Sequence, residues 1–463
     1  MMSGLACASL VLGLVSAVAA FASEPDPLPE RLAIEHVTVV PMSNEGASLP
    51  DMTVLVEDGR IVSIGPASAT RAPRGVKRID GRGKWLMPGL TDMHAHLGNV
   101  RMLRLFLNMP DLKQSVLRTE DLVTPFIANG VVRIMDMQAM SETIGQRTEI
   151  EAGRMLGPQI IAAAMIDGPQ PQWPVGATRV AAKPEDGRQA VRDAGAEGYD
   201  AIKVYSGLSF ETFSAIVDEA RRLNLPVVGH IPQRRSGRTK EFFQRGFSLV
   251  AHAEEFAQQT AQPSVAEIPR YVDMMKQNGA WLAATLSLDE RLLEQTRDPE
   301  SLHRRPEIRV LPPLLRDMAL NHNPYVAAAS PQRIEFLAQV VEFNRELVRA
   351  FVAADIPIVA GTDAPVPGVV PGFSMHDELA ALTRAGMNNR QALEAATRRP
   401  CEWLKLSTEC GTVEVGKRAD LILLDADPLA DISNSRRISA VILGGRYLPR
   451  AMLDRRVAAL AAR

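Results

Sequence analysis

Two histidines in this 463-residue chain have side chains and a spacing that could bind a metal ion. They close the run Trp-Leu-Met-Pro-Gly-Leu-Thr-Asp-Met-His-Ala-His. The segment Trp85 to Leu97 is predicted to be a buried strand, and side chains two residues apart on a strand share a face. His94 and His96 therefore project together and can bind one metal ion. A single His-x-His pair is weak evidence, so its meaning depends on further ligands along the chain.

Four more strand ends carry groups that can approach a metal. Lys203 lies in Ile-Lys-Val-Tyr, and His230 ends Pro-Val-Val-Gly-His. His252 ends Leu-Val-Ala-His, and Asp363 follows Ile-Val-Ala-Gly-Thr. If these strands belong to one barrel of parallel strands, their carboxyl ends meet at a single mouth. Groups far apart in sequence can then surround a pair of metal ions.

The middle of the chain alternates short β-rich runs with amphipathic helical stretches, which predicts an α/β fold of the (β/α)8 type. A helical insertion is expected over 289–349. The candidate strands are Leu86–His96, Val131–Met137, Ile160–Ala164, Ala201–Tyr205, Val227–His230, Leu249–His252, Trp281–Leu286 and Ile356–Gly361.

Both ends of the chain are rich in short strands that the barrel does not use. We expect residues 23–85 and 408–450 to form one small composite β-sandwich domain, with the barrel inserted between them over 86–407. Residues 451–463 are expected to be a C-terminal tail. Residues 1–22 contain no charged side chain and end in Ala20-Phe21-Ala22, a pattern typical of a cleaved signal peptide. An anchor that is never removed is the alternative.

In these motifs the sequence resembles the amidohydrolase superfamily, in its imidazolonepropionase-like and prolidase-like branch. The resemblance rests on Met-Pro-Gly-Leu-Thr-Asp-Met-His-Ala-His, Ile-Lys-Val-Tyr, Ala-Gly-Thr-Asp-Ala and Gly-Thr-Val-Glu-Val-Gly-Lys-Arg-Ala-Asp-Leu-Ile-Leu-Leu-Asp. It covers essentially the whole chain after the signal segment, including the split β domain. Ala251 departs from the glutamate that relatives commonly carry before the histidine of the sixth strand.

The resemblance implies a binuclear site with two divalent ions, for which Zn²⁺ is the expected metal. By this analogy His94 and His96 bind one ion together with Asp363, and His230 and His252 bind the other. Lys203 would bridge both as a carbamate, formed when a neutral amine reacts with carbon dioxide. Burial and nearby cations favour that neutral amine because both lower a lysine pKa. The alternative is a salt-bridged lysine at a single-metal site.

Three residues near the same strand ends are candidates for substrate contacts. Tyr205 shares a face with Lys203 and can donate a hydrogen bond to a developing oxyanion. Arg234 and Arg235 follow the His230 strand, where a basic loop can receive a substrate carboxylate. Packing for Tyr205 and a solvated loop for the arginines are the alternatives.

These features together predict a metal-dependent hydrolase of amide C–N bonds, acting on a dipeptide or an N-acyl amino acid. Asp363 is expected to take a proton from the attacking water and deliver it to the leaving amine. Hydrolysis of a cyclic amide, a lactone or an aryl amide is the second hypothesis. A metal-stabilised binding protein without catalysis is a third.

Composition limits the partners. The formal net charge of -2 and the 46% hydrophobic fraction favour a small-molecule substrate and give no reason to expect nucleic acid. Without the signal segment no stable membrane insertion is expected, and a homo-oligomer is possible. An exported protein, periplasmic or secreted, would permit a disulfide between Cys401 and Cys410, although two unpaired thiols fit equally well.

Overall fold

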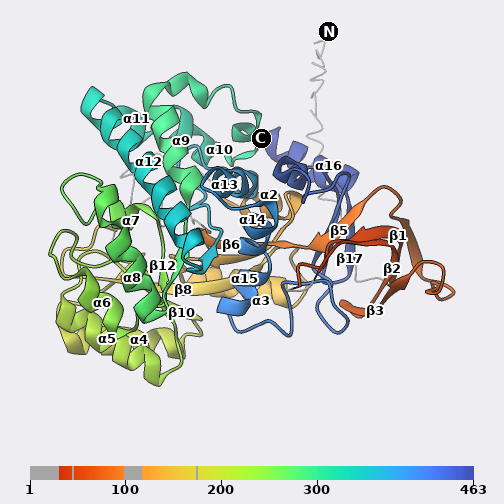
Figure 1. Cartoon of the computed structure of the whole chain (residues 1–463), viewed down its shortest axis with the longest axis horizontal. Helices are drawn as coiled ribbons and strands as arrows, with labels where there is room; N and C mark the ends of the chain where they lie inside the picture. The colour runs from red at the N-terminus through yellow and green to blue at the C-terminus, as the bar shows by residue number, and fades with distance from the viewer. Residues whose placement is uncertain (1–30, 44–45, 98–116, 174–175, 463) are drawn as a thin grey trace, which may run out of the picture.

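The computed structural model describes residues 31–43, 46–97, 117–173 and 176–462. Eight strands of its larger sheet are hydrogen-bonded neighbours in parallel and form the predicted (β/α)8 barrel, with helices around it (Figure 1). The eight are β6 (Leu90–Ala95), β7 (Val131–Asp136), β8 (Gln159–Asp167), β10 (Ala201–Val204), β11 (Val227–Gly229), β12 (Leu249–Val250), β13 (Trp281–Ala283) and β14 (Ile358–Val359).

The first and last barrel strands are joined, so the barrel closes. The Met93 amide donates to the Ala360 carbonyl at 2.9 Å, and the His96 amide donates to the Ala364 carbonyl at 2.7 Å. Inside the barrel each strand contributes at least one buried apolar side chain to a common layer. That layer contains Met93, Met135, Met137, Ala163, Ala201, Val228, Leu249, Ala283 and Val359.

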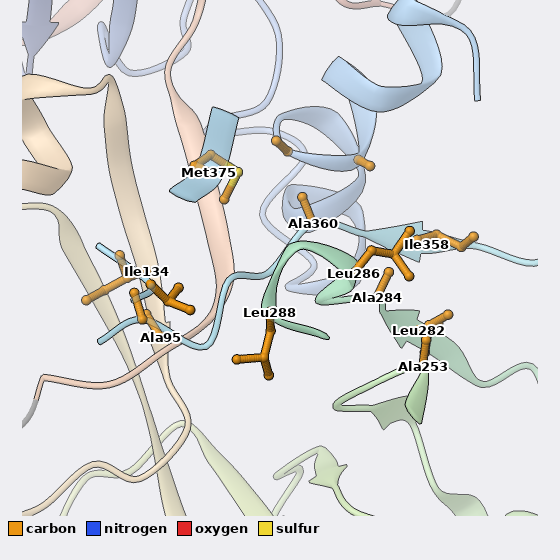
Figure 2. Close-up of a cluster of buried hydrophobic side chains, with 14 of the residues drawn as sticks. Ala95, Ile134, Ala253, Leu282, Ala284, Leu286, Leu288, Ile358, Ala360 and Met375 are labelled. Atoms are coloured by element: carbon orange, nitrogen blue, oxygen red, sulfur yellow. The ribbon is translucent and has the colours of Figure 1, made fainter. Parts of the chain in front are cut away.

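A second buried layer lies between the strands and the helices that cover them. Figure 2 shows part of it, where Ile134, Leu282 and Ile358 of the strands lie near Leu286, Leu288 and Met375 of the covering segments. The described α-helices are α2 (Thr119–Ala128), α3 (Ser141–Glu151), α4 (Pro184–Ala196), α5 (Phe210–Arg222), α6 (Thr239–Gly246), α7 (Glu254–Ala257), α8 (Ile268–Asn278), α9 (Leu286–Arg297), α10 (Pro313–Leu320), α11 (Pro324–Ala327), α12 (Pro331–Ala353), α13 (Phe373–Arg384), α14 (Asn389–Ala395), α15 (Arg398–Trp403) and α16 (Arg450–Ala461).

Local sequence explains where several of these helices begin. Ser209 caps α5 by accepting a hydrogen bond from the Thr212 amide at 3.1 Å, and Ser330 caps α12 in the same way. Pro331 follows that cap at the first helical position, where proline costs no hydrogen bond. Helices α9 to α12 occupy the predicted insertion and lie together at one end of the molecule (Figure 1).

The two chain ends form a separate sheet, which confirms the prediction that they belong to one second, smaller β domain. Its strands follow the order β17-β16-β15-β5-β1-β2-β3, with β4 paired to β1. The orange N-terminal strands and the blue β17 lie on the same side of the barrel (Figure 1). The bounds are β1 (Leu32–Val39), β2 (Leu49–Glu57), β3 (Arg60–Pro66), β4 (Lys77–Asp80), β5 (Trp85–Pro88), β15 (Leu421–Leu424), β16 (Ile438–Leu443) and β17 (Arg446–Pro449).

One predicted strand is in fact two. The segment expected as a single barrel strand, Leu86–His96, is divided at Gly89 between β5 of the end sheet and β6 of the barrel. The physical reason is a change of hydrogen-bonding partner. The Gly89 amide donates to the carbonyl of Asp420, whereas the Leu90 amide donates to the carbonyl of Gly130. A Cβ at Gly89 would lie 2.4 Å from Val132, so only glycine fits this crossing.

Three further predictions concern the chain ends and the thiols. The predicted signal peptide, 1–22, lies outside the described residues. None of the helices within the described ranges is long and apolar enough to cross a membrane. The expected tail contains helix α16, which packs against α2. Cys401 and Cys410 are joined by a disulfide, with their Cα atoms 5.9 Å apart.

The disulfide links α15 to the segment that leads into β15, and so connects the barrel covalently to the end sheet. We expect Cys401→Ser to lower the free energy of unfolding by roughly 2–3 kcal/mol, mainly by freeing the unfolded chain. Urea unfolding without reductant measures this. Reductant should reproduce the loss in the wild-type protein and add nothing in the variant; an equal effect on both would contradict the assignment.

Candidate metal centre

The barrel closure brings the most distant predicted residues together. His96 Nε2 lies 2.7 Å from Asp363 Oδ1, and His94 Nε2 lies 3.1 Å from the same oxygen. The Asp363 amide also donates to the His94 carbonyl at 2.7 Å. Asp363 has a positive φ of 61°, a conformation that aspartate tolerates better than most residues. Gly361 permits the approach, since a Cβ there would lie 2.8 Å from the Cβ of His94.

The buried side chain of Asp92 fixes this seam. Its Oδ1 accepts the amides of His94 and Thr362 at 3.1 and 3.0 Å, and its Oδ2 accepts the Thr362 hydroxyl at 2.6 Å. Burial raises the pKa of Asp92 to about 7, against the hydrogen bonds that lower it. Asp92 therefore holds the first ligand strand to the strand that delivers Asp363.

The other two histidines continue the same cluster. The His94 and His252 ring centroids are 4.4 Å apart, and those of His252 and His230 are 4.9 Å apart. Ligand atoms of His94, His252 and Asp363 all lie within 4.8 Å of one another. The four predicted histidines and Asp363 thus form one group at the carboxyl end of the barrel.

Lys203 is inside this group and is almost fully buried, at 3% exposure. Burial lowers its pKa to about 8, opposed by the carboxylates of Asp363, Asp136 and Glu255. Its charge in turn contributes to lowering the pKa of His94, His230 and His252. Within the described part of the chain no carboxylate oxygen lies within ion-pair distance of Lys203, so these three carboxylates act on its charge from farther away.

Burial also determines the protonation state of three of the imidazoles. It is the largest cause that lowers the pKa of His94 to about 3, and it lowers those of His230 and His252. Burial alone would raise the pKa of Asp363, but the neighbouring His94 and His96 outweigh it and hold that pKa well below the usual range. The site therefore offers neutral imidazoles beside an ionised carboxylate, which is the donor set that divalent ions prefer.

Three of the histidines are oriented through Nδ1. His94 Nδ1 lies 3.0 Å from the Ala251 carbonyl, His252 Nδ1 lies 2.9 Å from Thr285 Oγ1, and His230 Nδ1 lies 2.7 Å from Glu255 Oε1. A partner at Nδ1 leaves Nε2 to face the site, the usual arrangement of histidine ligands. His94 Nε2 is buried without a hydrogen bond of good geometry. The residues present thus fit a bound cation.

The three predicted substrate residues differ in burial and in their contacts. The Tyr205 ring packs on His230 with centroids 4.1 Å apart, and the Trp173 indole hydrogen-bonds its side chain. Burial raises the pKa of Tyr205, so the phenol stays protonated. Arg234 donates to Glu255 Oε1 at 2.7 Å and is only partly exposed. Arg235 is exposed and has no hydrogen bond or ion pair with any described residue.

Sequence reasoning missed the residues that support the ligands. Glu255 follows His252 by three positions in His-Ala-Glu-Glu, and this local spacing was the only available signal for it. Asp167 is buried at the end of β8 and accepts the amides of Gly168 and Gly207, both at 2.8 Å. It thereby ties the loop of Trp173 to the loop that follows Tyr205.

A second group that was missed is acidic. Glu254 and Asp289 interact with each other and with Asp363, and Asn344 donates to Asp289 Oδ2 at 2.8 Å. Burial is the largest cause that raises the pKa of Glu254 to about 7, followed by the charge of Glu255. Burial and Glu254 raise the pKa of Asp289 well above its usual value. The raised pKa values favour a protonated carboxyl group in this pair, which lies beside the cluster on the side of α7 and α9.

Comparison with known proteins agrees with this architecture. The model of the Amidohydrolase family matches residues 85–448. The 5-methylthioadenosine/S-adenosylhomocysteine deaminase of Halalkalibacterium halodurans is 24% identical over 421 residues, covering 85% of this chain and 84% of that protein. The 5-methylthioadenosine/S-adenosylhomocysteine deaminase of Symbiobacterium thermophilum is 43% identical over 67 residues, which cover only 15% of that protein's length.

Among solved structures, a candidate prolidase from Bifidobacterium longum superposes with a TM-score of 0.70 and 25% sequence identity. The superposition covers 94% of this chain and 100% of that one. The similarity therefore extends over the barrel and the end sheet together.

The contact of Thr285 with His252 can be tested by an isosteric change. Thr285→Val removes the oxygen that holds His252 Nδ1 and keeps the β-branched shape at a position with φ of 50°. We expect metal affinity to fall about 10- to 100-fold. Competition against a chelator measures it, with circular dichroism to confirm folding. An unchanged affinity in the folded variant would show that Thr285 does not orient the ligand.

Proposed function

Since this chain belongs to the amidohydrolase family, we propose that it is a metal-dependent hydrolase that cleaves an amide C–N bond in a small molecule. The observation that carries the proposal is the convergence of four imidazoles, one carboxylate and one buried lysine at the mouth of the barrel. A complete donor set that includes an acid–base group favours catalysis over metal-stabilised binding.

The proposed site holds two divalent ions, with Zn²⁺ the metal best suited to imidazole and carboxylate donors. His94, His96 and Asp363 would hold one ion, and His230 and His252 the other. Lys203 interacts electrostatically with members of both groups, which supports its proposed place between them.

The proposed bridge is a carbamate on Lys203. Its neutral amine would form an N–C bond with carbon dioxide and release one proton, giving an anion with two oxygen donors. The lowered pKa of Lys203, about 8, makes the neutral amine more accessible than in an exposed lysine.

When bound, the ions would lower the pKa of water and polarise the scissile carbonyl. Asp363 would take the proton of the attacking water and then deliver it to the leaving amine. Tyr205 would donate its hydroxyl to the developing oxyanion, because the Trp173 indole N–H already occupies an acceptor position on the phenol oxygen.

A dipeptide or an N-acyl amino acid is the proposed substrate. Arg234 keeps part of its guanidinium exposed beside the cluster, where a substrate carboxylate can reach it. Glu254 and Asp289 place buried carboxyl groups near Asp363, whose oxygens can accept hydrogen bonds from a free amino group and so favour a dipeptide. The similarity to the candidate prolidase supports the same class.

We further propose that the protein is exported. The Cys401–Cys410 disulfide supports this because such bonds persist in oxidising compartments. The apolar segment at the start of the sequence is the proposed signal.

A metal analysis combined with a substrate screen tests the function. The purified protein should carry two ions and hydrolyse members of a panel of dipeptides and N-acyl amino acids. Asp363→Asn should keep most of the metal and lose about 10²- to 10⁴-fold in kcat, because the amide oxygen can ligate but cannot accept the proton. Hydrolysis of cyclic amides alone would refute the substrate class, and unchanged turnover in the variant would refute the role of Asp363.

Removal of the lysine tests the bridge. Lys203→Ala should reduce the metal content to about one ion per chain or less, as measured by elemental analysis after gel filtration. Short carboxylic acids that replace the carbamate should partly restore the second ion. Retention of two ions in the untreated variant would show that Lys203 is not a bridging ligand.

A further inference from the structure

Glu255 lies behind the histidine cluster, and its fully buried carboxylate receives three hydrogen-bond donors. Its Oε1 lies 2.7 Å from His230 Nδ1 and 2.7 Å from Arg234 Nη2, while its Oε2 accepts the Ile231 amide at 2.9 Å. Glu255 belongs to α7 after β12, whereas its three partners follow or end β11. One side chain therefore ties together the segments that carry His230 and His252.

The chemistry of this contact determines which nitrogen of His230 carries the proton. Oε1 of Glu255 accepts the Arg234 guanidinium and Oε2 accepts the Ile231 amide, so both oxygens act as hydrogen-bond acceptors. A carboxylate in that arrangement can only accept from His230, so Nδ1 is the protonated nitrogen. The lone pair of Nε2 is then free to face the site.

Arg234 is held by the same oxygen. Its Nη2 lies 2.7 Å from Glu255 Oε1 and 3.4 Å from His230 Nδ1, so imidazole and guanidinium meet at one acceptor. The Tyr205 ring also packs on His230, with ring centroids 4.1 Å apart. The orientation of the imidazole and the place of the guanidinium therefore depend on one carboxylate.

We propose that Glu255 is a positioning residue that sets the tautomer of His230 and fixes Arg234 beside it, so that one rigid unit serves the second metal ion and the substrate carboxylate. This inference rests on the proposed function, because it assigns His230 to an ion and Arg234 to a substrate. It predicts that one substitution alters both metal affinity and KM.

Glu255→Gln is the sharpest test because it keeps size and shape. A carboxamide offers one acceptor oxygen, so its NH₂ must face either the Ile231 amide or the pair formed by His230 and Arg234. If it donates to Nδ1, the proton of His230 moves to Nε2 and blocks that ligand. We expect the second ion to bind about 10- to 100-fold more weakly and the first ion to keep its affinity.

The measurement is a Zn²⁺ titration of chelator-stripped protein in competition with a chromophoric chelator. At saturating Zn²⁺, KM for the dipeptide that the wild-type protein hydrolyses fastest should rise more than kcat falls. Urea unfolding gives the stability of each variant, so that a loss of fold is separated from a loss of ligand orientation.

Asp420→Asn is the matched control. Asp420 is also a buried carboxylate, and it accepts the Gly444 amide at 2.7 Å and the Arg418 guanidinium at 3.0 Å, but it lies immediately before β15 of the end sheet. Its loss should lower stability and leave both metal affinities and KM unchanged. This contrast distinguishes a specific effect on the site from the general cost of altering a buried acid.

Wild-type affinity for both ions in folded Glu255→Gln would overturn the inference and leave the proposed function intact. Wild-type protein that takes up no Zn²⁺ would instead overturn the proposed function, and the inference with it. If Glu255→Gln does not fold, Arg234→Gln serves in its place. That variant should raise KM for substrates with a carboxylate, and an unchanged KM would overturn the role given to Arg234.

Discussion

The candidate site depends first on the hydrogen-bonded seam that closes the barrel between β6 and the end of β14. His94 and Asp363 are separated by most of the barrel in sequence, yet backbone hydrogen bonds across this seam place them in contact. Asp92 adds three hydrogen bonds from a fully buried side chain. Because a parallel barrel delivers its strand ends to one mouth, closing it here is sufficient to complete the cluster.

Burial is the second constraint, and for His94, His230, His252 and Lys203 it lowers the pKa, which is the direction that metal binding requires. Imidazoles removed from water lose their proton, and the amine of Lys203 is pushed toward its neutral form. Buried polar groups without a partner lower the stability of a protein. A bound cation would therefore stabilise the folded chain as well as take part in the reaction. Stability and function are therefore linked at this site.

Much of this arrangement could be predicted from the sequence because it follows from local patterns. Each metal-competent residue ends a short apolar run, and the barrel converts those positions into neighbours. The division of Leu86–His96 at Gly89 could not be predicted, since the run is continuous and only the change of partner strand separates its two halves. The amidohydrolase family and the two-part fold were predicted correctly from the motifs.

The residues that orient the ligands escaped prediction for a different reason. Thr285 and Glu255 contact histidines on neighbouring strands, and no periodic pattern marks such a contact. Arg234 was expected in a basic loop that can receive a substrate carboxylate, but the structure also gives it the carboxylate of Glu255, which a linear sequence does not reveal.

The two halves of the cluster are consequently supported in different ways. The half with His94, His96 and Asp363 is fixed by backbone hydrogen bonds across the seam and by the buried side chain of Asp92, all within the closed barrel. The half with His230 and His252 depends on the side chains of Glu255 and Thr285, and through Glu255 it is joined to Arg234 and the loop after β11. Changes of substrate preference are therefore easier to accommodate in the second half, because its loops can be altered without opening the barrel.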